Sequence, residues 1–280
     1  MRHPALILLL LLVFCVSAGA QSYYWETPRQ LVSPPARFPL AASGGGLIAL
    51  VWQVMESDPE GGGRAYLSIQ TSRDAASWRR NDRFLGPIDY EEQEVQLYSM
   101  AIDPSGTIYL AVAAGENRTE VHRSTDEGRS FTLLSTIEAG TASLAPSITL
   151  TDGSNLILFV TQERGDSLLI FRSVSANGRS WSDFQPLVAE GRLPFNFLPS
   201  HASLNGREYV VFQAWPSGSG EERNYQLYMV TSSDNGATWS APERLNLSGS
   251  IAGEEFSAEA YSNQRPQLKI QDSNLVLAWE

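Results

Sequence analysis

The side chains best suited to ligand chemistry are polar residues near the ends of four apolar segments, where each follows a residue that is bulky in three of the four cases. The pairs are Trp52-Gln53, Thr161-Gln162, Phe212-Gln213 and Trp279-Glu280. If these segments are equivalent strands of a repeated unit, Gln53, Gln162 and Gln213 form a polar ring at one end of the units, with aromatic faces available for stacking on a sugar. The alternative is a strand-end pattern with no binding role.

A recurring phrase shows that the chain is built from repeats. Its two full copies are Ser-Thr-Asp-Glu-Gly-Arg-Ser-Phe at 124–131 and Ser-Ser-Asp-Asn-Gly-Ala-Thr-Trp at 232–239. Two weaker copies end at Trp78, where the phrase is one residue shorter, and at Trp181, where Ala176 replaces the aspartate. The four terminal aromatic residues are 53, 50 and 58 residues apart, which indicates one supersecondary unit per repeat.

The residues before each phrase predict a small antiparallel meander. In the third unit, apolar stretches at 146–150, 156–160 and 167–171 are separated by turns, the first of them Asp152-Gly153. The second stretch of each unit is apolar almost throughout, which in a sheet indicates burial on both faces. We therefore predict an all-β fold of four-stranded antiparallel blades arranged radially as a β-propeller. A parallel β-helix needs shorter rungs and no hairpins and is disfavoured.

The recurring phrase itself is typical of a tight turn. Its carboxylate can accept backbone N–H groups, its glycine can adopt positive φ, and its aromatic ring can pack beneath the turn. We therefore assign its residues a structural rather than catalytic role. They are Asp74, Asp126, Gly128, Phe131, Trp181, Asp234, Gly236 and Trp239.

The phrase resembles the Asp-box, or bacterial neuraminidase repeat, of the sialidase-like β-propellers, and the resemblance extends over about residues 30–280. The resemblance implies six blades. Four units and the first two strands of a fifth are visible before residue 280. We therefore expect a lead-in at 21–33 and, at 34–280, a propeller that is incomplete at its C-terminus.

The first twenty residues predict a signal peptide. Arg2 and His3 precede an apolar core that is too short for a stable membrane span, and Ala18-Gly19-Ala20 is a cleavage signal. Cleavage after Ala20 leaves no cysteine, no disulfide and no transmembrane segment, in a secreted or periplasmic protein. A lipoprotein anchored at Cys15 is the less favoured alternative.

Composition bears on the partners. The net charge is −11 and Lys269 is the single lysine, which disfavours a nucleic-acid partner. The sequence has no HExxH motif and no histidine pair at ligand spacing, so we expect no metal and no cofactor. The acidic run at 89–94 is more simply explained as a solvated loop than as a metal site.

The sialidase resemblance implies a particular site. In that family three arginines hold the sialic-acid carboxylate, an aspartate is the acid/base, and a tyrosine assisted by a glutamate is the nucleophile. Arg37, in Arg37-Phe38-Pro39, matches the first arginine, and Asp58 matches the acid/base. Arg265 precedes a proline at the start of the fifth unit in the same frame as Arg37 and would bind the carboxylate too. Both arginines could instead only cap their blades. Gln53 and Val54 stand where a second family arginine is expected, which departs from the pattern.

Two functions follow from these observations. The first is a secreted sialidase-like propeller whose central funnel binds a glycan or another polar ligand, with sialic acid the expected sugar. Its substrate-binding residues would be Arg37, Arg265, Gln53, Gln162 and Gln213. The alternative is an exo-α-sialidase or related glycoside hydrolase with Asp58 as acid/base and its remaining catalytic residues beyond residue 280.

Overall fold

The computed structural model describes an all-β chain. The described residues are 30, 36–57, 63–90, 96, 98–114, 117–138, 146–152, 154–189, 191–215, 224–245, 249–251, 254–256, 263–271 and 273–279. Within these ranges no helix occurs, and hence no helix that could cross a membrane. The predicted signal peptide and Asp58 lie outside the described residues.

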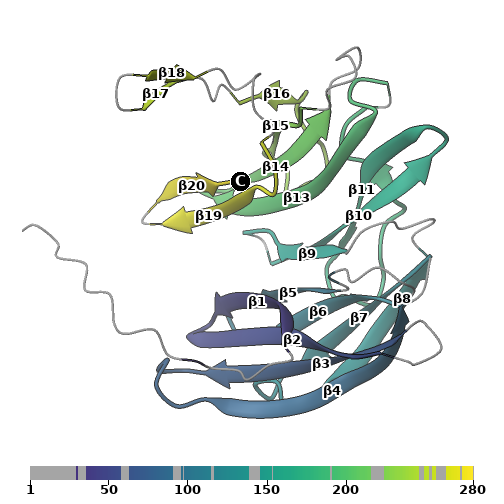
Figure 1. Ribbon diagram of the computed structural model, residues 1–280, viewed down its shortest axis with the longest axis vertical. Coiled ribbons are helices and arrows are strands. Elements are labelled where there is room, and N and C mark those ends of the chain that lie inside the picture. Colours follow the sequence, from purple (N-terminus) through teal and green to yellow (C-terminus); the bar gives the residue numbers. More distant parts are fainter. Residues whose placement is uncertain are drawn as a thin grey trace, which may run out of the picture. The chain divides into compact units, whose positions relative to one another are not determined.

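The strands follow one another as repeated meanders (Figure 1). The first unit contains β1 (Arg37–Gly44), β2 (Leu47–Ser57), β3 (Gly63–Ser72) and β4 (Arg79–Tyr90). The second contains β5 (Tyr98–Ile102), β6 (Ile108–Ala113), β7 (Arg118–Ser124) and β8 (Thr132–Glu138). The third contains β9 (Ser147–Leu150), β10 (Leu156–Arg164), β11 (Ser167–Ser175) and β12 (Gln185–Pro186).

The fourth unit contains β13 (Phe195–Leu204), β14 (Arg207–Trp215), β15 (Gln226–Ser232) and β16 (Glu243–Arg244). A separate hairpin of β17 (Gly249–Ile251) and β18 (Glu254–Phe256) follows. The fifth unit is represented by β19 (Gln267–Gln271) and β20 (Asn274–Ala278).

The strand order confirms antiparallel pairing within each unit, with one departure from separate sheets. β1–β4 and β5–β8 each form a four-stranded sheet. The third and fourth units share one eight-stranded sheet, because Leu168 of β11 pairs in parallel with Phe195 of β13. The last strand of the third unit, β12, has two residues and therefore covers only part of the edge of β11. The uncovered part of this edge can pair with β13 of the next unit.

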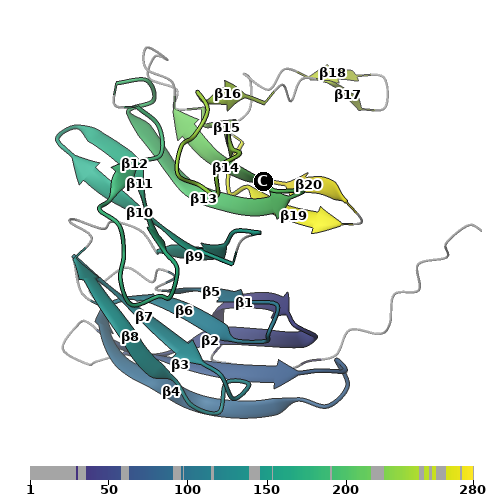
Figure 2. The same cartoon turned by 180° about the vertical axis from the view of Figure 1, so that it is seen from behind.

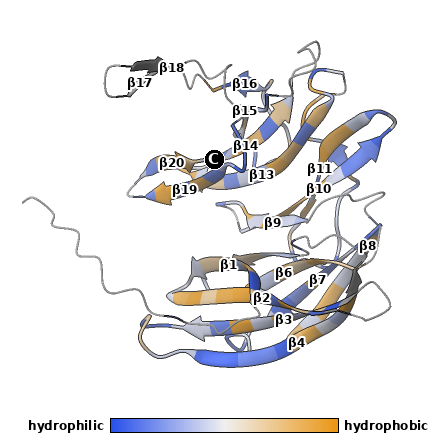
Figure 3. Cartoon of the chain, in the orientation of Figure 1, coloured by the Kyte–Doolittle hydropathy of each residue, from blue (hydrophilic) through white to orange (hydrophobic). Residues whose placement is uncertain are grey.

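The second strands of the first four units are largely buried on both faces, as their apolar sequences predict, whereas β20 is half exposed. Leu156–Val160 of β10 is buried throughout, and Figure 3 shows hydrophobic residues along β2 and hydrophilic ones along much of β4. Among the described residues, four hydrophobic clusters lie between consecutive units and bring their faces together. The Asn205-Gly206 turn between β13 and β14 has φ of 54° and 73°, the pair of positive values that a type I′ hairpin requires.

The first strands of the units lie side by side (Figures 1 and 2). The Tyr98 hydroxyl, at the start of β5, contacts the carbonyl oxygens of Phe38 in β1 at 2.5 Å and of Val51 in β2 at 2.8 Å. Ile148 N of β9 donates to Ser99 Oγ of β5. In the same way, Leu268 N of β19 donates to Ser200 Oγ of β13. These bonds join equivalent ends, so the first strands run in the same direction.

The recurring phrase forms the predicted turn. Asp126 Oδ1 accepts from the Ser124 hydroxyl at 2.8 Å and from Ser130 N at 3.0 Å, and Asp234 has the same arrangement with Ser232 and Thr238. Burial raises the pKa of Asp126, but these hydrogen bonds outweigh it and hold the pKa at about 2.

The third copy of the phrase differs from the sequence interpretation. Ala176 does not occupy the aspartate position. Asn177 does, since its Oδ1 accepts from Arg179 N at 2.8 Å and from Ser180 N at 3.1 Å. Ser175 and Asn177 keep the two-residue spacing of Ser124 and Asp126. The turn therefore keeps its side-chain acceptor, and the missing residue lies between Asn177 and Trp181.

Each of these turns is also held by the preceding unit. Asn81 Nδ2 donates to Gly128 O at 2.9 Å, Ser135 Oγ donates to Gly178 O at 2.7 Å, and Arg172 Nη2 donates to Ala237 O at 2.6 Å. The Phe131 ring stacks on Phe84 of the first unit, with ring centroids 4.3 Å apart. The phrase therefore fastens neighbouring units as well as its own strands.

Candidate functional site

The starts of the first strands and the ends of the second strands gather the predicted binding residues at one end of the units, which we call the mouth. Arg37 of β1 is paired in register with Gln53 of β2, and the backbone N of Arg265 donates to Gln213 Oε1 at 2.8 Å. The opposite end, with the Asp-containing turns, is the turn end.

The three predicted glutamines occupy equivalent stations but do not face solvent. Gln53, Gln162 and Gln213 are exposed by 0%, 2% and 1%. Their amides contact protein groups: Gln53 Nε2 lies 3.4 Å from Met55 Sδ, and Gln162 Oε1 accepts from Arg164 Nη2 at 2.9 Å. The buried glutamines therefore hold neighbouring residues of the mouth in place, and a ligand would contact the exposed residues around them.

An exposed arginine accompanies each buried glutamine. Arg37 is the cross-strand partner of Gln53, Arg164 donates to Gln162, and Arg265 binds Gln213 through its backbone. The sequence interpretation missed Arg164, although its position two residues after Gln162 was a usable signal. The mouth therefore carries positive charge on at least three units of an acidic chain.

Arg265 is not in the same frame as Arg37, contrary to the sequence expectation. Phe38, Leu198 and Arg265 each precede a proline, with φ of 51°, 53° and 51°. Arg265 is therefore equivalent to Phe38 and lies one residue beyond the station of Arg37. Positive φ bends the strand before the proline, and β1 and β13 have register shifts at this point.

The aromatic residues predicted for sugar stacking divide into two groups. Trp52 and Phe212 are buried in the core, with exposures of 1% and 0%. Trp279 is 43% exposed, and its Nε1 donates to Asn263 Oδ1 at 3.0 Å, which fixes one edge of the ring.

Four further aromatic rings lie at the mouth of the fourth unit. Phe195 pairs with Trp215 at 5.1 Å between ring centroids, and Phe197 meets Tyr225 edge-on at 5.3 Å. All four are half-buried, and Asn263, which holds Trp279, donates its backbone N to Tyr225 O. These residues were not identified from the sequence, because they are spread over three segments that only the fold brings together. We call Phe195, Phe197, Trp215, Tyr225 and Trp279 the aromatic cluster.

The hairpin of β2 and β3 adds charge near the mouth of the first unit. Glu56 and Arg83 form an ion pair, and the Arg83 guanidinium lies 4.7 Å from the centre of the Tyr66 ring. Asp58 follows on the same hairpin loop but lies outside the described residues, so its role stays a prediction.

A hydroxyl, an imidazole and a carboxylate form a chain nearer the turn end. Thr149 Oγ1 lies 2.8 Å from His201 Nδ1, and His201 Nε2 lies 2.7 Å from Glu208 Oε2. Ser203 also donates to Glu208. The order of groups is that of nucleophilic triads, but the His201 and Glu208 side chains are 2% and 0% exposed. We therefore interpret the chain as a link between the third and fourth units.

The glutamate of this link is charged. Burial raises the pKa of Glu208, but hydrogen bonds from His201 and Ser203 and the nearby imidazole outweigh burial and lower it below its usual value. No group of three potential metal ligands occurs in the part of the chain that the structure describes.

Comparison with known proteins identifies the fold. No family model and no curated protein sequence matches the chain. A Penicillium chrysogenum α-L-arabinanase complexed with arabinobiose superimposes with a TM-score of 0.63 at 18% identity, covering 88% of this chain and 76% of that one. The α-L-arabinofuranosidase Arb93A of Fusarium graminearum gives 0.56 at 17% identity, covering 78% and 67%. An α-L-arabinofuranosidase of Clostridium thermocellum gives 0.52 at 12% identity, covering 86% and 81%.

These likenesses show the class of fold, a β-propeller of the kind found in glycosidases. They confirm the predicted propeller. They do not support the narrower assignment to the sialidases that the Asp-box resemblance implied.

Proposed function

We propose that this chain is a glycan-binding β-propeller whose mouth takes a neutral sugar, and that it is a glycoside hydrolase acting on α-L-arabinofuranosyl linkages. The fold supports the class of protein, since the similar structures include an α-L-arabinanase and an α-L-arabinofuranosidase. Fold alone does not confer activity, so the proposal depends on the residues of the mouth.

The observation that carries the proposal is the aromatic cluster. Sugar rings present C–H faces that stack on aromatic side chains, while their hydroxyls need polar partners nearby. The Trp279 ring is held by Asn263, whose backbone N donates to Tyr225 O, and Arg265 of the same unit donates its backbone N to Gln213 at the mouth. Aromatic rings and a guanidinium at one mouth fit a saccharide better than a purely apolar or a purely ionic ligand.

Hydrolysis of a glycosidic bond generally requires two carboxyl groups on either side of it. Asp58, in the loop between β2 and β3, is our proposed acid/base. The carboxylate of Glu56 lies on the same hairpin and is held by Arg83, so it is a fixed negative charge near the mouth. The propeller fold and these carboxyl groups favour a hydrolase over a passive binding module.

Sialic acid is the second candidate ligand. The exposed arginines Arg37, Arg164 and Arg265 favour it, because a planar guanidinium matches a carboxylate in a bidentate fork. We also propose export by the signal peptide at residues 1–20, since an enzyme acting on polymeric glycans must meet its substrate outside the cell.

The test is turnover of arabinobiose, of p-nitrophenyl α-L-arabinofuranoside and of a fluorogenic sialoside by the purified chain. Asp58→Asn is the test variant. Asp82→Asn is the matched control, because Asp82 is an exposed carboxylate whose ion pair, among the described residues, is with Arg80. Arabinoside release that is lost in Asp58→Asn and kept in Asp82→Asn supports the proposal.

Release from the sialoside alone would show that the substrate is a sialic-acid glycoside and not a neutral arabinoside. Binding of arabinobiose without release, with the fold verified by circular dichroism, would contradict the hydrolase and leave a binding protein. Neither binding nor release of any of the three compounds would contradict both functions.

A further inference from the structure

A polar cleft at the turn end, between the third and fourth units, differs from the equivalent cleft between the first and second. Both lie where an Asp-containing turn meets the outer strands of the preceding unit. The cleft of the third and fourth units has a volume of about 500 Å³, and the other one has about 350 Å³. Neither is lined by residues of the mouth.

In the smaller cleft, an ion-pair network ties the two units together. Glu127, which follows Asp126 in the turn, accepts from Arg73 at 2.7 Å and from Arg79 at 2.7 Å. Both arginines belong to the first unit and Glu127 to the second. Three of the charged groups that line this cleft thus bind one another, and their ion pairs bridge the two units across it.

The larger cleft lacks this network at the same stations. Asn235, with φ of 56°, takes the place of Glu127, whose φ is 59°. Ala176 follows Ser175 as Arg73 follows Ser72, and Ser182 follows Trp181 as Arg79 follows Trp78. Substitution of all three charged residues by smaller neutral ones leaves the cleft open.

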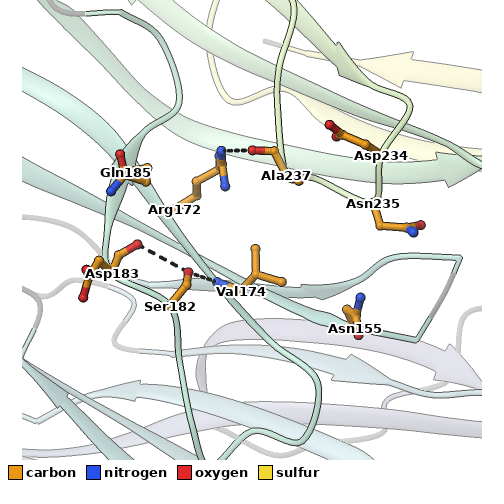
Figure 4. Close-up of a pocket in the computed structure, with 9 residues that line it drawn as sticks. All are labelled: Asn155, Arg172, Val174, Ser182, Asp183, Gln185, Asp234, Asn235 and Ala237. Carbon is orange, nitrogen blue, oxygen red and sulfur yellow. Dashed lines mark hydrogen bonds between the residues drawn. The ribbon is translucent and has the colours of Figure 1, made fainter.

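Within the described residues, the side chains of the open cleft bond to backbone groups of its lining, and no hydrogen bond or ion pair joins two of these side chains. Figure 4 shows Arg172 on β11, Asp183 on the loop after it and Gln185 on β12, with Asp234 and Asn235 on the facing turn. Within the described part of the chain, the Arg172 guanidinium makes one hydrogen bond, to Ala237 O at 2.6 Å, and its Nε is buried without a partner. A half-buried guanidinium with unused donors is an incomplete site.

The charges of the cleft decide the class of ligand. Arg172 contributes one positive charge, and Asp183 and Asp234 contribute two negative ones. Both Asp234 oxygens are already used by Ser232 and Thr238, whereas no hydrogen bond of the Asp183 carboxylate occurs within the described residues. A net negative lining repels an anion, while mixed donors and acceptors suit a ligand whose hydroxyls both donate and accept.

We propose that this cleft is a second saccharide-binding site, separate from the mouth, that takes a neutral sugar unit. The volume of about 500 Å³ lies within the range of roughly 300–1,000 Å³ typical of small-molecule sites. The guanidinium of Arg172 and the amides of Gln185 and Asn235 donate to sugar oxygens, and Asp183 accepts from a hydroxyl. The inference rests on the proposed function for its class of ligand, and extends it from one site to two.

The experiment is an NMR titration of the ¹⁵N-labelled full chain with arabinobiose. Amide shifts are expected in two groups, one at 234–238 and 182–185 and one around the aromatic cluster. The variant Ser182→Arg/Asn235→Glu rebuilds the ion pair of the other cleft and should abolish the first group while leaving the second. Arg172→Met should weaken binding at the cleft at least tenfold, and Arg192→Met, at an exposed arginine outside the cleft, is its control.

The outcomes separate this inference from the proposed function. Shifts at the mouth alone overturn the second site and leave the proposed function standing. Shifts at the cleft alone, lost in the Ser182→Arg/Asn235→Glu variant, support the second site and contradict sugar binding at the mouth. Cleft shifts with inorganic phosphate but not with arabinobiose overturn the neutral ligand, and no shift at either site contradicts both proposals.

Discussion

Replacement of Glu208 by Gln tests whether the buried link between the third and fourth units stabilises the propeller. Glu208 is fully buried, and its carboxylate accepts from His201 Nε2 at 2.7 Å and from Ser203. His201 in turn contacts Thr149 of β9, so this one carboxylate completes a chain across two units. The glutamine keeps the shape of the side chain but loses the charge and one acceptor.

The expected loss follows from these contacts. A hydrogen bond to a charged group contributes about 1.5–3 kcal/mol, and a buried donor left unpaired costs about 1–3 kcal/mol. Both donors bind Oε2, so the amide oxygen of Gln can still accept from them, but only as a neutral group, and its NH₂ then faces Asp152 N, which donates to Oε1 at 3.4 Å. We therefore expect a loss of about 2–3 kcal/mol in the free energy of unfolding. For a domain of this size that lowers Tm by roughly 4–12 °C.

The assay is urea unfolding followed by tryptophan fluorescence at pH 7 and at pH 3.5, with Glu243→Gln on the exposed strand β16 as control. The pKa of Glu208 is lower in the folded state than in the unfolded state, so its charge stabilises the fold at pH values above the unfolded pKa. This stabilisation is lost as the pH falls from the unfolded pKa to the folded pKa. The difference between wild type and Glu208→Gln should therefore narrow at pH 3.5. If Glu208→Gln lowers the free energy of unfolding at pH 7 by less than about 0.5 kcal/mol, as the control does, the chain of Thr149, His201 and Glu208 does not stabilise the fold.

Three further changes test the turns and the mouth. Gly236→Ala should destabilise the chain by about 1–2 kcal/mol in thermal unfolding, because φ there is 81° and a Cβ would lie 2.9 Å from Ile157 Cδ1; no change in Tm would contradict this. Asp126→Asn should make unfolding less dependent on pH between about 4 and 2, because the lowered pKa of Asp126 stabilises the fold above its unfolded value and that stability is lost as pH falls toward 2. An acid titration by circular dichroism that is identical in wild type and Asp126→Asn would count against it. Trp279→Ala should weaken arabinobiose binding about tenfold in a fluorescence titration, and an unchanged Kd would exclude this ring as the stacking platform.

Local chemistry made the repeat and its turns predictable. The Ser-x-Asp spacing and the following glycine specify a turn whose hydrogen bonds close within a few residues, so Asp126 and Asp234 could be assigned from sequence. The same logic failed at Ala176 because alignment by residue count hid the two-residue spacing that Asn177 preserves. The frame of Arg265 was mistaken for a similar reason, since the positive φ before proline, rather than the arginine, marks the equivalent positions.

The binding residues were only partly predictable. Alternation and strand ends placed Gln53, Gln162 and Gln213 at equivalent stations, but burial depends on what the neighbouring unit packs against them. The aromatic cluster has no sequence signature, because its members come from β13, the end of β14, the residue before β15 and the residue after β20.

The sequence alone determined the all-β repeat, the Asp-containing turns and the order of the strands, because each depends on residues close together in the chain. Tertiary structure decided which of the candidate side chains are buried. The three glutamines and Trp52 are buried by the packing of neighbouring strands and units. It also decided that the cleft beside Arg172 is open where the cleft beside Glu127 is bridged, since that difference arises between residues of separate units and depends on their packing.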